Sequence, residues 1–89
     1  MNQISGCYKK EGIKLCQAKK WPQAIERFDF AIKKCSSDYD DKYSLFWWKA
    51  NTLKLNGNIS EASISYQSAL SMAPNDKKEE IRKQLKGLK

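Results

Sequence analysis

The chain contains no histidine, and its three cysteines lie far apart, at positions 7, 16 and 35. Zinc sites are built chiefly from cysteine and histidine at close, regular spacings, so this pattern favours no metal site. An odd number of cysteines cannot pair completely within one chain. On a helix Cys7 and Cys16 would lie about 13.5 Å apart, too far for a disulfide. We therefore expect three free cysteines, as in cytoplasmic proteins, and no cofactor.

Long apolar runs are also missing. No stretch approaches the roughly 20 apolar residues that a membrane-spanning helix needs. The N-terminus lacks the apolar centre of a secretory signal peptide. We therefore predict a cytoplasmic protein without a transmembrane segment, and 89 residues are enough for one small domain.

The chain also has too few acidic residues to offset its basic ones, and its net charge is +7. Cations dominate near the C-terminus, where only Glu79 and Glu80 oppose Lys77, Lys78, Arg82, Lys83, Lys86 and Lys89. The middle of the chain, in contrast, carries Asp38, Asp40 and Asp41. A basic helix face usually keeps that face in water, so nucleic-acid binding is the less favoured interpretation.

Apolar residues recur at helical spacing along nearly the whole chain, and patterns typical of strands are absent. We predict an all-α fold with helices at about 3–18, 22–35, 42–56, 60–72 and 76–88. Pro22 suits the first position of the second helix, and Gly57 a left-handed C-terminal cap. Ser60 is the predicted N-cap of the fourth helix, and Asn75 or Asp76 that of the fifth. Short turns between such helices favour stacked antiparallel hairpins.

The two halves of the chain match each other at an offset of 38 residues. Small residues pair with small ones and large apolar residues with large ones: Tyr8 with Phe46, Gly12 with Ala50, Leu15 with Leu53, Ala24 with Ala62, Phe28 with Tyr66, Ala31 with Ala69 and Ile32 with Leu70. Small residues at such positions let the two helices of a hairpin approach closely. The pattern predicts two copies of one helical hairpin, with the paired residues in the core.

The spacing of these residues resembles the tetratricopeptide repeat, a helix–turn–helix unit. The second copy matches it through Phe46, Ala50, Leu53, Ala62, Tyr66 and Pro74, and the first through Tyr8, Gly12, Leu15, Ala24 and Phe28. Glu11 and Lys49 depart from the leucine that the family has before the small residue, and Ser36 replaces the closing proline. The resemblance implies a single domain, with repeats at 3–35 and 42–74 stacked in a right-handed superhelical array. Residues 76–88 would form an amphipathic capping helix.

Trp47 and Trp48 are adjacent, so they cannot share one side of a helix. Measured from Phe46 at 100° per residue, they lie about 100° and 200° round the helix, with Asn51 near 140°. In the repeat family this surface of each first helix lines a concave groove that receives partners. The resemblance therefore implies a groove formed by Lys9, Lys10, Ile13, Gln17, Trp47, Trp48, Asn51 and Lys54. An alternative for Trp47 is that it packs sideways against the first helix.

These residues favour a protein-interaction scaffold that binds a peptide or a partner helix with acidic and apolar anchors. Ile13 and Trp48 stand where the family's chaperone-type carboxylate clamp has asparagines, so that clamp is not expected. No acidic pair shares the groove and no phosphate loop surrounds Gly57, so we do not expect an enzyme. Two alternatives stay open: self-association or packing within a larger assembly, and contact of the basic last helix with RNA or an anionic membrane.

Overall fold

The computed structural model describes residues 3–34 and 42–88, with side chains from Lys9 onward in the first of these ranges. Within these ranges it contains five helices and no strand: α1 (Gln3–Gln17), α2 (Trp21–Lys34), α3 (Lys42–Leu55), α4 (Ile59–Met72) and α5 (Asn75–Lys86). The predicted all-α class is confirmed. The predictions for the side chains of Cys7 and Tyr8, and for Cys35, lie outside the described residues, whereas Cys16 is free.

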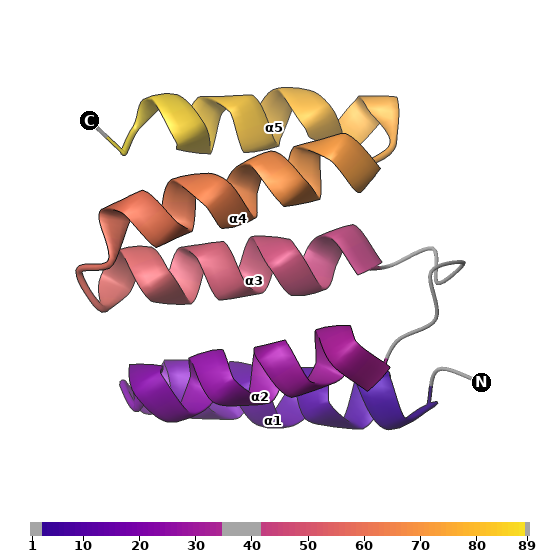
Figure 1. Ribbon diagram of the computed structural model, residues 1–89, viewed down its shortest axis with the longest axis vertical. Helices are drawn as coiled ribbons and strands as arrows, with labels where there is room; N and C mark the ends of the chain where they lie inside the picture. The colour runs from indigo at the N-terminus through magenta and orange to yellow at the C-terminus, as the bar shows by residue number, and fades with distance from the viewer. Residues whose placement is uncertain (1–2, 35–41, 89) are drawn as a thin grey trace.

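Each helix packs mainly against the next one in the sequence (Figure 1). Helices α1 and α2 form one hairpin, α3 and α4 form a second, and α5 lies against α4. The two hairpins meet chiefly where α2 contacts α3. An ion pair between Lys49 Nζ of α3 and Asp29 Oδ1 of α2, at 2.5 Å, lies at this contact. The result is a compact domain built by sequential helix packing.

The helix ends differ from the predictions in a few places. Gly57 has a φ of +90°, as expected for a left-handed residue after a helix. The predicted cap at Ser60 is wrong, because α4 begins at Ile59 with Asn58 in the N-cap position. The Asn58 side chain does not cap α4, since its Oδ1 accepts a hydrogen bond from Asn56 Nδ2 at 2.7 Å.

The fifth helix also begins earlier than predicted. Its N-cap is Pro74, whose backbone oxygen accepts hydrogen bonds from the amides of Lys77 and Lys78. Asn75 is therefore the first residue of α5 rather than its cap. At α2, the helix begins at Trp21, so Pro22 is its second residue. The missing N–H of Pro22 is still harmless there, because the first four amides of a helix have no acceptor within it.

Most of the buried core residues belong to the pairs that match between the two halves of the chain, and Leu45, Ala73 and Ile81 add to them. Seven of the eight core residues that the spacing predicts are buried: Ala24, Phe28, Ala50, Leu53, Ala62, Tyr66 and Ala69. Leu70, the eighth, is partly buried against the same cluster. Gly12 is buried as well, and a Cβ atom built on it would lie only 2.7 Å from Cε1 of Phe28. Close approach of α1 and α2 thus depends on the absence of a side chain at Gly12.

Helix α3 is buried on two sides. Ala50 and Leu53 belong to the core cluster shared with α4 and α5. Leu45 packs instead against Ala31 and Ile32 of α2. A helix with neighbours on both sides needs apolar residues on both, so the sequence of α3 has no single apolar stripe.

Candidate functional site

The predicted groove residues lie on α1 and α3, and polar contacts join these two helices. Lys9 Nζ donates a hydrogen bond to Ser44 Oγ at 2.8 Å. Farther along, Thr52 Oγ1 donates to the backbone oxygen of Trp48 at 2.8 Å and lies 3.5 Å from Cys16 Sγ. Lys9 thus bridges the two hairpins.

Trp47 points toward the last helix. Its indole Nε1 donates a hydrogen bond to Gln84 Oε1 of α5 at 2.9 Å. Its ring also packs against Tyr43, with centroids 6.4 Å apart, and joins the cluster formed by α3, α4 and α5. Among the described residues Trp47 thus contacts α5 and its own helix, and its packing against the first helix, the alternative that its sequence position left open, stays a prediction.

Trp48 points in a different direction, toward the first hairpin. Its ring stacks on Phe28 of α2, with centroids 6.2 Å apart and planes 19° apart. The two tryptophans therefore contact different helices, Trp47 contacting α5 and Trp48 contacting α2, which packs against α3. The expectation that both face one groove stays a prediction. Both tryptophans are half-buried, and any role of either in partner binding stays a prediction.

Asn51 is held by a residue of α4. Its Oδ1 accepts a hydrogen bond from the hydroxyl of Tyr66, whose side chain is fully buried. Burial raises the pKa of Tyr66 to about 12, so the hydroxyl keeps its proton and remains a donor. This contact fixes the side-chain amide of Asn51, and its Nδ2 has no hydrogen-bond partner among the residues that the structure describes.

The other predicted groove residues are more open to solvent. Lys10, Gln17 and Lys54 are exposed, and Ile13 is half-buried. At 100° per residue, Lys10, Ile13 and Gln17 fall within about 60° on α1, as do Trp47, Asn51 and Lys54 on α3. We call these six residues the α1/α3 face: Lys10, Ile13, Gln17, Trp47, Asn51 and Lys54. Lys9 borders it, whereas Trp48 lies behind it against Phe28.

Two residues that complete this arrangement, Tyr66 and Gln84, were not among the predicted site residues. Tyr66 was expected only in the core, because its matched partner is Phe28. The available signal was its hydroxyl group, which needs a partner once it is buried. Gln84 belongs to a highly charged helix. The one sequence feature that could have indicated its role is that it is an uncharged amide next to an apolar position.

The α1/α3 face presents two side-chain amides, two ammonium groups, one indole ring and one aliphatic side chain. In residues 3–34 and 42–88 no group of three histidine, cysteine, aspartate or glutamate side chains is placed to hold a metal ion. In the same part of the chain, no helix is both long and apolar enough to cross a membrane. Comparisons of the chain with protein-family models, curated proteins and solved structures find no match.

Proposed function

We propose that this chain is a tetratricopeptide-like interaction module that binds a peptide or a partner helix on the α1/α3 face. The repeat interpretation is supported by the burial of matched residues in both hairpins. Ala24 and Ala62, Phe28 and Tyr66, and Ala31 and Ala69 are all fully buried. In such an array α5 takes the position of a capping helix, and the first helix of each hairpin is left to receive a partner.

The observation that carries the binding proposal is the fixed amide of Asn51. Its oxygen is occupied by Tyr66, and its Nδ2 group has no partner in the described part of the chain. A preoriented donor on a half-buried side chain suits a backbone carbonyl of a bound segment. Because Tyr66 holds the amide in place, binding would not need to immobilise it.

The other residues of the α1/α3 face support a proposal for the chemistry of the partner. Lys10 and Lys54 are exposed cations with no ion pair among the described residues. The half-buried Ile13 offers an apolar surface beside Lys10 on α1. We therefore expect the partner segment to combine at least one acidic group with an apolar anchor.

The sharpest test replaces the donor of Asn51 without removing its acceptor. Asn51→Asp keeps an oxygen for the Tyr66 hydroxyl but replaces Nδ2 with a second acceptor, which repels a backbone carbonyl. Peptides selected from a displayed library on the purified domain should bind Asn51→Asp at least about tenfold more weakly, a loss of about 1.4 kcal/mol. Isothermal titration calorimetry measures this change, and circular dichroism checks that the fold is kept.

Gln67→Glu is the matched control, because it makes the same amide-to-carboxylate change at an exposed position of α4. It should leave affinity within about twofold of the wild type, since it lies outside the α1/α3 face. Equal binding by wild type and Asn51→Asp would mean that the peptides bind elsewhere. A loss caused instead by Lys83→Glu with Lys86→Glu would favour the basic α5 as the binding surface.

Self-association remains a second candidate, and one observation favours it. Ile64 and Met72 of α4 are 64% and 45% exposed, and no charged residue occurs between Ala62 and Asn75. Two copies of a chain with a net charge of +7 repel each other least at an uncharged surface. Sedimentation equilibrium would detect a dimer, and Ile64→Glu should dissociate it if α4 is the interface.

A further inference from the structure

A pocket lies on the first hairpin. Its volume is about 290 Å³, and Glu11, Lys14 and Leu15 of α1 and Arg27 of α2 line it. At 100° per residue, Lys14 lies about 40° from Lys10 round α1, Glu11 about 100° and Leu15 about 140°. The pocket therefore borders the α1/α3 face at Lys14 and extends away from it toward α2.

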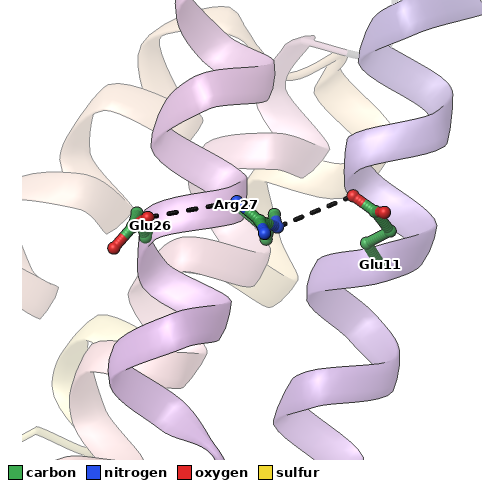
Figure 2. Close-up of polar contacts among 3 residues, drawn as sticks. All are labelled: Glu11, Glu26 and Arg27. Atoms are coloured by element: carbon green, nitrogen blue, oxygen red, sulfur yellow. Dashed lines mark ion pairs between the residues drawn. The ribbon is translucent and has the colours of Figure 1, made fainter.

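Arg27 stands between two carboxylates but is bound tightly by neither (Figure 2). Its Nε lies 3.6 Å from Glu11 Oε1 across the hairpin, and its Nη1 lies 3.9 Å from Glu26 Oε1 on the same helix. Charge-assisted hydrogen bonds are shorter, at about 2.7–2.9 Å. The Arg27 side chain is also 42% exposed, so water screens both pairs. The guanidinium is thus available to a further anion.

Lys14 supplies a second cation to the same pocket. Its side chain is exposed, and its ammonium group has no ion pair or hydrogen bond among the described residues. Leu15 is half-buried and provides the apolar wall. The pocket therefore combines two available cations, one carboxylate and one aliphatic surface.

We propose that this pocket binds an apolar carboxylate. The ligand's carboxylate would lie between Lys14 and Arg27, and its aliphatic part would contact Leu15. Glu11 would accept an N–H group where the ligand has one, as in the last residue of a peptide. The volume lies at the lower end of the range of ligand pockets, which suits a ligand about the size of one amino-acid residue.

The test is a titration of the ¹⁵N-labelled full chain, followed by the backbone amide signals in NMR spectra. The ligands are N-acetyl-leucine, hexanoate and N-acetyl-leucinamide. We expect N-acetyl-leucine to shift the signals of Glu11, Lys14, Leu15 and Arg27 with a Kd on the order of 1–10 mM, typical of a ligand this small. Tighter binding of N-acetyl-leucine than of hexanoate would favour a peptide C-terminus, whereas equal binding would favour a free carboxylic acid.

Two comparisons decide whether the carboxylate is recognised. N-acetyl-leucinamide has the same shape without the charge and should not produce saturable shifts. Lys14→Gln should weaken N-acetyl-leucine binding about fivefold, the upper end for an exposed ion pair, while Lys83→Gln on α5 removes the same charge and should change it less than about twofold. Equal shifts from the amide, equal effects of the two variants, shifts confined to other surfaces, or no saturable shift would each overturn the proposal.

Discussion

Replacing Gly12 by alanine would test how closely α1 and α2 approach. The added Cβ would lie 2.7 Å from Cε1 and 2.8 Å from Cζ of Phe28. Carbon atoms in favourable contact are about 3.5–4.0 Å apart, so the ring or the helix must move. Phe28 is fully buried and stacks on Trp48, which leaves its ring little room to move.

Two opposing effects set the size of the change. Alanine favours a helix over glycine by about 1 kcal/mol, which would stabilise α1. Overpacking of a well-packed core costs about 1–3 kcal/mol. Because the contact is with a buried ring rather than a mobile chain end, we expect overpacking to dominate. Gly12→Ala should lower the free energy of unfolding by about 1 kcal/mol, and the Tm by about 4–8 °C in a domain of this size.

Urea denaturation followed by tryptophan fluorescence measures this change, and a double-mutant cycle assigns its cause. In a Phe28→Leu background the ring is gone, so Gly12→Ala should be less destabilising by at least about 1 kcal/mol. Helix propensity, in contrast, is the same in both backgrounds. A stabilising effect of Gly12→Ala in the wild type, or the same effect in both backgrounds, would refute the close contact.

Two further predictions follow from contacts of α3. Trp48→Ala should lower the free energy of unfolding by about 2 kcal/mol in urea denaturation, because it removes a half-buried ring stacked on Phe28; unchanged stability would mean that the ring contributes no packing. Burial raises the pKa of Tyr66 from 10.0 to about 12, so Tyr66 ionises in the unfolded chain at a lower pH than in the folded one. Its contribution to the free energy of unfolding is therefore complete below pH 10 and is lost as the pH rises through about 12. Comparing the unfolding free energy at about pH 9 and about pH 11 in wild type and Tyr66→Phe checks this, and an equal decrease in both would contradict it.

The hairpins and their cores could be predicted from the sequence because they depend on local spacing. Ala24, Phe28, Ala62 and Tyr66 recur at the same distance in both halves, and all four are fully buried. Small and aromatic residues placed in this way leave few other ways to pack two adjacent helices. The first residues of α2, α4 and α5 were less certain, because a helix end is decided by single hydrogen bonds such as that between Asn56 and Asn58.

The directions of the tryptophans could not be predicted in the same way. A helical angle places Trp47 and Trp48 relative to Phe46, but it does not tell what lies beyond the hairpin. Only the position of the neighbouring hairpin shows that Phe28 covers Trp48, and only that of α5 shows that Gln84 meets Trp47. The same limit applies to the pocket, since the pairing of Arg27 with Glu11 depends on how two helices align.

The burial of α3 on two sides also bears on how the domain unfolds. Leu45 belongs to the cluster shared with α2, and Ala50 and Leu53 to the cluster shared with α4 and α5. If either hairpin separated from the other, one apolar side of α3 would be exposed to water, at a cost that grows with the exposed area. Partial opening at this contact is therefore unfavourable, and we expect the two hairpins to unfold as one cooperative unit rather than as two independent foldons.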